Sequence, residues 1–234
     1  MKGSMSDKPH PRAVVLLSGG MDSCVTASLA AKDHDVYALH ASYGQRTQQR
    51  EKRAFREVAR SINASETLEV DLQALAKIGA SSLVDKSAPI PTDGETGGIP
   101  STYVPFRNGV LLSLAVAWAE SVEAESVFIG AVGRDQSQGY PDTTREFFDA
   151  FENAANIGTR PETKVKIVVP LVKMTKTEVV KRGLELGAPL EHTWSCFQAD
   201  EVACGVCMSC RGRKKAFREA GVEDKVPYEV GEEH

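Results

Sequence analysis

No apolar run in this sequence approaches the roughly 20 residues that a membrane-spanning helix requires, and its first residues do not form a secretory signal peptide. Lysine and arginine number 28 against 32 aspartate and glutamate residues, which gives a net charge of -4. The chain therefore lacks the basic excess that favours binding to nucleic acid or to an anionic membrane. We expect a cytoplasmic protein that binds neither.

The composition is that of an ordinary globular protein. Apolar residues make up 41% and charged residues 26%, and 234 residues can bury a sizeable core as one domain with a small appendage. A short tail precedes a second methionine, Met5, so residues 1–11 are expected to be an expression tag and a disordered N-terminus.

A glycine-rich turn near the N-terminus is the first strong signal. Residues 14–17 are apolar and predict a buried strand, and a helix is expected from residue 24. Between them, a turn of this kind directs backbone N–H groups and the positive end of a helix dipole at one point, where a phosphate binds. The turn lacks the Lys-Ser/Thr ending of a Walker A loop, and S-G-G-x-D-S instead resembles the loop of ATP pyrophosphatases (PP-loop enzymes). The expected ATP-binding residues are Leu17, Ser18, Gly19, Gly20, Met21, Asp22 and Ser23. The alternative is an ordinary glycine turn.

Strands and helices are expected to alternate along the chain. Apolar patterning predicts strands at residues 14–17, 36–43, 66–70, 127–132 and 166–169, and helices at 24–32, 48–62, 72–78, 108–121, 143–156 and 175–186. The last of these helices opens with a capping box, Thr175-x-x-Glu178. This alternation predicts a Rossmann-like, doubly wound parallel α/β sheet with helices on both faces. Ligands in such folds bind at the C-terminal ends of the strands.

Two irregular stretches interrupt this pattern. Residues 79–105 form a connection long enough to favour a mobile lid over a passive tether. It leads to Arg107 and Asn108 at the start of an apolar helix, where an arginine opposes the helix dipole unless an anion binds there. The stretch 133–143 follows a strand at the ligand edge, so a site role and a plain turn are both open. Tyr140 and Asp142 in this stretch, with Arg107 and Asn108, are the substrate-binding candidates.

Four of the five cysteines lie close together near the C-terminus. They are Cys196, Cys204, Cys207 and Cys210, in the pattern C-x7-C-x2-C-x2-C. In a reducing compartment this density favours a metal over disulfides, and four thiolates suit a closed, structural tetrahedral zinc, one per chain. An iron–sulfur cluster also fits four cysteines, and redox chemistry is a weaker alternative. Cys24 is expected to be a small buried residue. We therefore divide the chain into a nucleotide-binding α/β domain, 12–190, and a zinc-binding C-terminal segment, 191–234.

Taken together, these features resemble the QueC family of 7-cyano-7-deazaguanine synthases over about residues 12–221. The blocks that carry the resemblance are LLSGGMDS at 16–23, SYGQR at 42–46, GIPSTYVPFRN at 98–108, GYPD at 139–142, MTKTE at 174–178, TWSCF at 193–197 and CGVCMSCR at 204–211. The resemblance implies a nucleotide-binding domain, zinc on the four cysteines and a homodimer. One loop departs from the family pattern S-G-Y-P-D-C, since Gln138 is inserted and Thr143 follows Asp142.

The resemblance also implies a reaction. The carboxylate of 7-carboxy-7-deazaguanine would attack the α-phosphorus of ATP, and ammonia would displace AMP to give an amide. A second adenylation, of the amide oxygen, would allow loss of AMP and formation of the nitrile. Mg²⁺ is expected with ATP, and the catalytic candidates are Ser18, Asp22, Arg107 and Lys176, which would position and neutralise the phosphates.

Three alternatives accompany this interpretation. A PP-loop tRNA sulfurtransferase would need a catalytic cysteine pair near ATP, and Cys24 has no partner in the sequence. A QueC-like paralogue could stop early or pass the activated acyl group to another amine, which the altered loop around Gln138 keeps open. A zinc-ribbon binding module would have no enzymatic activity.

Overall fold

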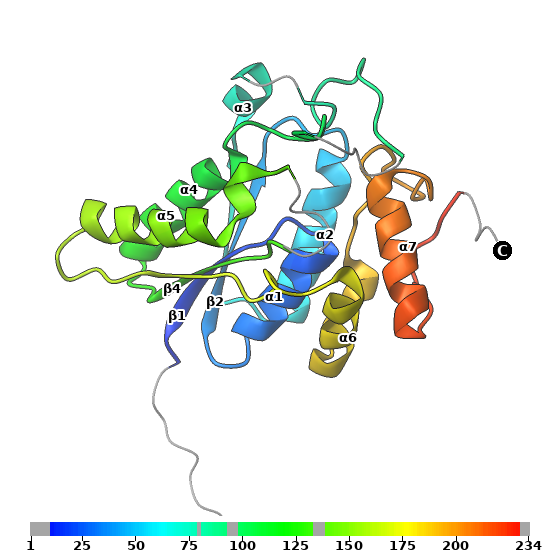
Figure 1. The fold of residues 1–234 in the computed structure, drawn as a ribbon. Coiled ribbons are helices and arrows are strands. Elements are labelled where there is room, and N and C mark those ends of the chain that lie inside the picture. Colours follow the sequence, from blue (N-terminus) through cyan, green and yellow to red (C-terminus); the bar gives the residue numbers. More distant parts are fainter. Residues whose placement is uncertain (1–9, 79–80, 93–97, 133–138, 230–234) are drawn as a thin grey trace, which may run out of the picture.

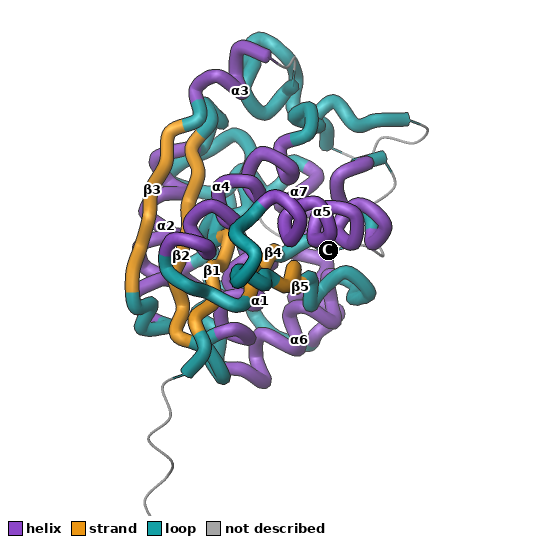
Figure 2. Tube along the Cα trace, turned by 90° about the vertical axis from the view of Figure 1, so that its left-hand side faces the viewer, coloured by secondary structure: helices purple, strands orange, loops and turns teal. Residues whose placement is uncertain are grey.

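The computed structural model describes residues 10–78, 81–92, 98–132 and 139–229. Five parallel strands form one sheet in the order β3-β2-β1-β4-β5 (Figures 1 and 2). The strands are β1 (Arg12–Leu16), β2 (Asp35–Ser42), β3 (Glu66–Asp71), β4 (Ser126–Ile129) and β5 (Lys166–Val168). Strand order reverses on either side of β1, so the predicted doubly wound parallel sheet is confirmed. Residues 1–9 of the expected N-terminal tag and disordered segment, and most of the loop around Gln138, lie outside the described residues.

Helices cover both faces of the sheet, as Figure 1 shows. The α-helices are α1 (Met21–Ala30), α2 (Gln48–Ser61), α3 (Gln73–Ile78), α4 (Arg107–Ser121), α5 (Arg145–Gly158), α6 (Lys176–Leu186) and α7 (Met208–Ala220). Side chains of α1, α2, α6 and α7 share one apolar core with β1 and β2, and those of α4 and α5 share a second core on the other face. Cys24 is fully buried in the first core, as expected.

Most predicted elements are confirmed with small shifts at their ends. The predicted capping box is present, with the Thr175 hydroxyl accepting from the backbone N–H of Glu178. Helix α1 begins at Met21 rather than at residue 24, because the turn is completed by Gly20, whose extended backbone forms the N-cap. Strand β4 ends at Ile129 although Ala131 and Val132 are also buried, so apolar character continues past the hydrogen-bonded ladder.

The residues after 190 pack partly against the region where the strands end, and partly, through α7, into the first core. A third apolar cluster joins the four clustered cysteines to Trp194, Tyr43 and Ala54. Arg213 of α7 is 3% exposed and forms a bidentate ion pair with Asp224 at 2.7 and 3.0 Å. The same guanidinium donates to the Thr193 hydroxyl at 2.6 Å, which fixes the segment that leads to Trp194 and Cys196. No helix among the described residues is long and apolar enough to cross a membrane.

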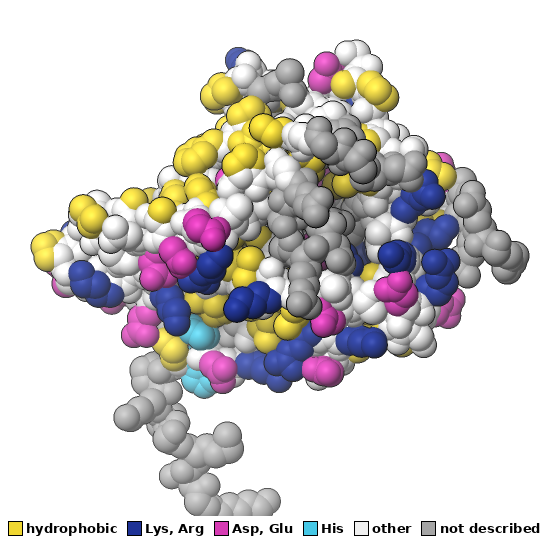
Figure 3. All heavy atoms as spheres, in the orientation of Figure 1, with side chains coloured by type: hydrophobic (Ala, Val, Ile, Leu, Met, Phe, Trp, Pro, Cys, Tyr) yellow, Lys and Arg dark blue, Asp and Glu magenta, His cyan; other side chains and the backbone are white. Residues whose placement is uncertain are grey.

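Charged and apolar side chains gather on different parts of the protein surface. Figure 3 shows basic and acidic side chains interspersed over the lower part of one face, whereas apolar side chains gather over α4 and α5. Phe106, at the N-cap of α4, and Ile157, near the end of α5, are among the exposed large apolar residues. Mixed charge of this kind agrees with the small net charge of the sequence.

Candidate active site

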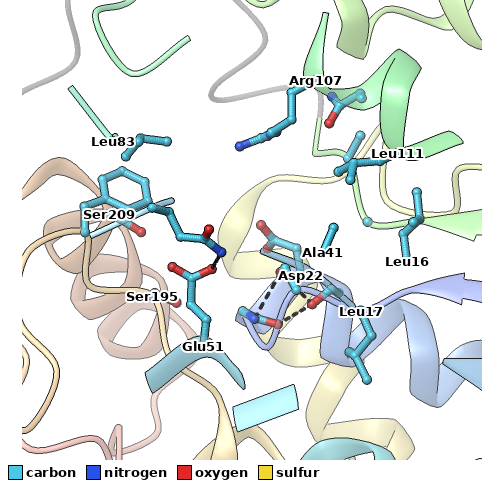
Figure 4. A pocket seen from close by; sticks show the side chains of 18 of the residues that line it. Leu16, Leu17, Asp22, Ala41, Glu51, Leu83, Arg107, Leu111, Ser195 and Ser209 are labelled. Atoms are coloured by element: carbon cyan, nitrogen blue, oxygen red, sulfur yellow. Dashed lines mark hydrogen bonds between the residues drawn. The ribbon is translucent and has the colours of Figure 1, made fainter. Parts of the chain in front are cut away.

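A cavity of about 330 Å³ opens at the C-terminal edge of the sheet. It lies where the ends of β1, β2 and β4 meet the first turns of several helices, and Figure 4 shows part of its lining. Polar residues that line it come from several parts of the chain: Ser18, Asp22 and Ser23; Tyr43, Gln45, Arg46, Thr47 and Glu51; Thr102, Arg107 and Asn108; Tyr140 and Thr143; Lys176; and Ser195 and Ser209. This is the position that the strand order predicts for a ligand.

The glycine-rich turn forms one wall of the cavity. The Ser18 and Ser23 hydroxyls lie 3.0 Å apart, and the Gly20 backbone N–H donates to Ser18 Oγ at 3.2 Å. Gly20 caps α1 without a side-chain hydrogen bond, so the first turn of the helix presents backbone N–H groups and two hydroxyls to the cavity. This geometry suits an anion, and phosphate binding at the turn stays a prediction. Leu17, Ser18, Gly20, Asp22 and Ser23 line the cavity, whereas Gly19 and Met21 do not.

Glycine is required at position 19 by the backbone conformation and by the atoms that lie close to it. Its φ is +90°, and a Cβ placed there would lie 2.6 Å from the backbone oxygen of Glu51. The turn therefore packs directly against helix α2. Gly130, just after β4, is similarly tight, because a Cβ there would lie 3.0 Å from backbone atoms of Asp22 and Ser23. Glycine at both positions allows two backbones to support the turn closely.

Lys176, at the N-terminus of α6, forms an ion pair with Asp22 Oδ2. These residues are 154 positions apart, and both were expected to take part in catalysis. The other carboxylate oxygen, Asp22 Oδ1, is buried and accepts no hydrogen bond from any described residue. A carboxylate oxygen in this position is a suitable ligand for Mg²⁺.

Three of the four substrate candidates, Arg107, Asn108 and Tyr140, line the cavity, and the fourth, Asp142, does not. Arg107 donates to the Tyr43 hydroxyl at 3.1 Å and lies over the Tyr43 ring, with its guanidinium carbon 5.7 Å from the ring centroid. The electrostatic influence of Tyr43 raises the pKa of Arg107, so the guanidinium stays charged. Asn108 and Tyr140 also line the cavity.

Asp142 does not line the cavity and instead supports the residues that do. Its carboxylate accepts from the backbone N–H of Asn108 at 2.9 Å, and its carbonyl oxygen accepts from the Asn108 side chain at 3.1 Å. A carboxylate at the start of α4 also suits the helix dipole and offsets the unfavourable position of Arg107.

Sequence reasoning missed a group of polar residues after β2. Glu51 lines the cavity, and its carboxylate accepts from Thr47 at 2.6 Å and from Gln45 at 3.0 Å. Burial raises the pKa of Glu51 above its ordinary value. The signal that could have identified these residues is the position of the SYGQR block, which begins at the C-terminal end of a strand beside β1.

Part of the predicted lid lies over the same cavity. Leu83 and Thr102, which belong to the long connection before α4, are among the lining residues. Arg46 donates to the carbonyl oxygens of Asp85 and Ala88, which ties this connection to the end of β2. The described residues of the connection therefore form a wall of the site, and its movement as a lid stays a prediction.

The four clustered cysteines form a group suited to a metal ion. All four sulfurs lie within 4.8 Å of one another, and the residues are buried. The Cys204 and Cys210 sulfurs are 3.9 Å apart, close to the roughly 3.8 Å expected between thiolates bound tetrahedrally at about 2.3 Å. Backbone N–H groups of Ala199, Cys204 and Cys207 donate to sulfurs of the group at 3.4 Å, which favours thiolates.

Close contact among the four thiols favours the thiolate form at one cysteine and the neutral form at another. Hydrogen bonds from Cys207 and Cys210 hold the pKa of Cys196 far below its ordinary value, while hydrogen bonding to Cys196 raises the pKa of Cys207 to about 12. A divalent ion would remove this difference, because it binds every sulfur as a thiolate. The cluster is thus consistent with a zinc site. Helix α7 begins at Met208, so that Cys207 is its N-cap and Cys210 lies in its first turn.

Comparison with known proteins identifies one protein family that this chain matches over most of its length. A family model described as "Queuosine biosynthesis protein QueC" matches residues 12–221. The chain is 52% identical over 218 residues to a 7-cyano-7-deazaguanine synthase from a Nitratiruptor species, a match that covers 93% of this chain and 98% of that protein. It is 50% identical over 221 residues to a protein of the same name from Methanoculleus marisnigri, with 93% and 99% covered.

Among solved structures, the NMN synthetase from Francisella tularensis is similar in fold. The TM-score is 0.50 at 19% sequence identity, and the match covers 92% of this chain and 79% of that chain. At this identity the likeness concerns the fold alone.

Proposed function

The chain belongs to the QueC family of queuosine biosynthesis proteins, and on that premise we propose that it is an ATP-dependent ligase that forms 7-cyano-7-deazaguanine from 7-carboxy-7-deazaguanine and ammonia. The observation that carries the proposal is the cavity that joins the phosphate-binding turn to Arg107, Asn108 and Tyr140. One end suits the phosphates of ATP, and the other offers polar groups for a small heterocyclic acid. The similarity of about 50% over nearly the full length of its relatives supports the same activity.

The proposed chemistry follows from what each end of the cavity can hold. A carboxylate lacks a leaving group, so its oxygen attacks the α-phosphorus of ATP and pyrophosphate departs toward the turn at Ser18 and Ser23. The amides and hydroxyls of that turn would stabilise the negative charge that develops on the departing pyrophosphate. Ammonia then displaces AMP, and a second adenylation activates the resulting amide. No side chain becomes covalently attached, so catalysis rests on positioning and electrostatics.

Lys176 and Arg107 are the proposed cationic groups for the phosphates. Lys176 contacts the pyrophosphate turn through Asp22, whereas Arg107 reaches the cavity from α4. Asp22 Oδ1 would hold Mg²⁺, which supplies further neutralisation of the triphosphate. Asn108 and Tyr140 would contact the deazaguanine, and Asp142 would hold Asn108 in position.

We assign the cysteine cluster a structural zinc, one per chain. Four sulfur ligands complete a tetrahedral shell and leave no position for substrate. A reduced cysteine cluster also suits the cytoplasm. A homodimer is expected from the family resemblance.

The sulfurtransferase alternative meets a specific obstacle. Cys24 is fully buried in the first core and does not line the cavity, and burial also raises the pKa of its thiol, which disfavours the thiolate required for sulfur transfer. The other four cysteines belong to the metal-binding group. A relative that transfers the activated acyl group to another amine differs from the proposal only in its product.

Product analysis tests the proposal and distinguishes it from a paralogue that stops at the amide. The protein is incubated with ATP, Mg²⁺, ammonium and 7-carboxy-7-deazaguanine, and the products are followed by mass spectrometry and phosphorus NMR. The nitrile should appear with two AMP and two pyrophosphate per turnover. Accumulation of the amide alone would indicate a paralogue that stops early, and release of ADP and phosphate would contradict adenylation.

A further inference from the structure

Glu51 faces the cavity from the first turn of α2. In Figure 4, the side chains of Glu51, Asp22 and Arg107 reach toward the same space from three different helices. Thr47 Oγ1 donates to one carboxylate oxygen of Glu51 at 2.6 Å, and Gln45 Nε2 donates to the other at 3.0 Å. Each oxygen thus keeps a lone pair that can accept a proton from a molecule in the cavity.

The carboxylate is held rigidly and by neutral partners. The Gln45 side chain that contacts Glu51 is itself fixed, because its carbonyl oxygen accepts from the Tyr43 backbone N–H at 2.8 Å. The Thr47 hydroxyl also lies 3.3 Å from the carbonyl oxygen of Cys196, which links the group to the C-terminal segment. The residues that follow β2 and the C-terminal segment therefore both fix the direction in which the carboxylate points.

The surroundings of Glu51 raise the proton affinity of its carboxylate. Burial raises its pKa, and the charge of Asp200 acts in the same direction. The hydrogen bonds from Thr47 and Gln45 and the charge of Arg107 act in the opposite direction without cancelling the effect of burial. A carboxylate with a raised pKa accepts protons more readily than an exposed glutamate does.

The other acidic residue of the cavity is already engaged. Among the described residues that line the cavity, only Asp22 and Glu51 are acidic. Asp22 forms an ion pair with Lys176 beside the pyrophosphate turn, so its carboxylate is already committed to a cation. Glu51 is therefore the carboxylate available for proton transfer.

The proposed reaction requires a base at each of its two nitrogen steps. In the first, the ammonia nitrogen forms a C–N bond to the adenylated carbonyl carbon, the C–O bond to AMP breaks, and the nitrogen must lose one proton to become an amide. In the second, the O-adenylated amide loses two protons from nitrogen as the C–O bond breaks toward AMP and the C≡N bond forms. These protons need an acceptor within reach of the reacting nitrogen.

We propose that Glu51 is the general base that accepts these nitrogen-bound protons, one at a time, and releases each to solvent before the next. The proposal rests on the function given above. Glu51 acts after adenylation, so its removal should separate ATP activation from the formation of the C–N bond.

The test compares Glu51→Gln with the wild-type enzyme in two assays. Exchange of labelled pyrophosphate into ATP, dependent on 7-carboxy-7-deazaguanine, measures adenylation alone. It should stay within about threefold of wild type, while ammonia-dependent amide and nitrile formation falls about 100-fold or more, the usual range for loss of a general base. Glu51→Asp should retain an intermediate rate. Glu57→Gln, a half-exposed change on the same helix, is the matched control and should behave as wild type.

Hydroxylamine separates a chemical role from a structural one. It is a weaker base than ammonia and is unprotonated at neutral pH, so it should restore formation of the first C–N bond in Glu51→Gln, giving the hydroxamate. The proposal is overturned if hydroxylamine fails to restore that step, if pyrophosphate exchange falls as far as amide formation, or if ammonia reacts at the wild-type rate. Failure of the wild-type protein to show acid-dependent exchange would instead reject the proposed function itself.

Discussion

Lys176 contacts Asp22 across 154 residues of sequence and joins the start of α6 to the start of α1. Both side chains are largely buried, with 16% and 24% exposed. The pair lies beside the pyrophosphate turn, so a cation and a carboxylate are held ready where phosphate and Mg²⁺ would compete for them. We interpret it as a preformed phosphate and metal site rather than a device for stability, because ion pairs of this kind contribute little net stability once desolvation is counted.

The first prediction concerns this pair. Asp22→Asn should remove the Mg²⁺ ligand, and Lys176→Met should remove a phosphate contact, so each should lower acid-dependent pyrophosphate exchange by about 100-fold or more. Each single variant also leaves the largely buried charge of the other residue unpaired, so its melting temperature should fall, and exchange is measured at a temperature where the variant is folded. Ser18→Ala should lower exchange in the same way without leaving an unpaired charge. Near-normal exchange in any of the three variants would reject the assigned role of that residue.

A second prediction concerns the geometry of the turn. Gly19 and Gly187 both have positive φ, +90° and +64°, but only Gly19 is crowded, since nothing lies within 4 Å of a Cβ at Gly187. Gly187→Ala should cost about 1 kcal/mol of unfolding free energy, the ordinary penalty for a left-handed backbone. Gly19→Ala should cost more than this and should also weaken ATP binding, because the turn must move away from α2. Urea denaturation and ATP titration of the two variants measure both effects, and equal stability losses would contradict the packing argument.

Prediction from sequence placed residues correctly where they lie close together in the chain. Ser18 and Asp22 share one turn at the cavity, and Cys204, Cys207 and Cys210 lie in one cluster, while their roles stay predictions. Prediction failed for Glu51, because only the parallel pairing of β2 with β1 brings the start of α2 to the phosphate-binding turn.

Asp142 is the opposite case, because the sequence suggested it for the ligand site and it lies outside the cavity lining. Its place in a loop at the ligand edge suggested substrate contact, but the structure places it behind Asn108 as a support for α4. The direction in which a side chain points depends on the positive φ of Phe106 and the path of the loop, and neither follows a periodic pattern.

The metal gives a third prediction. A closed four-thiolate shell couples zinc binding to folding of the C-terminal segment, so Cys204→Ser or Cys207→Ser should lose zinc and thermal stability first. Activity should fall as a consequence, partly because Cys196 lines the cavity and Cys207 caps α7. Elemental analysis should give about one zinc per wild-type chain. The matched control is Cys24→Ala, which removes a buried thiol outside the cluster and should keep its zinc. A water or substrate atom on the zinc in a crystal structure would make the metal part of the chemistry.

The last prediction uses the raised pKa of Glu51. Because burial holds its pKa in the folded protein above the value near about 4.3 in the unfolded chain, the folded state binds this proton more tightly. The contribution of Glu51 to stability is therefore fully present below the unfolded pKa and is lost as the pH rises through the folded pKa. Glu51→Gln removes the cost of burying the charge, so it should raise the melting temperature at about pH 8 and have much less effect near pH 4. A pH-independent difference between the two proteins, or a variant that is less stable at pH 8, would show that the charged carboxylate is stabilised in the fold and is not poised to take up a proton.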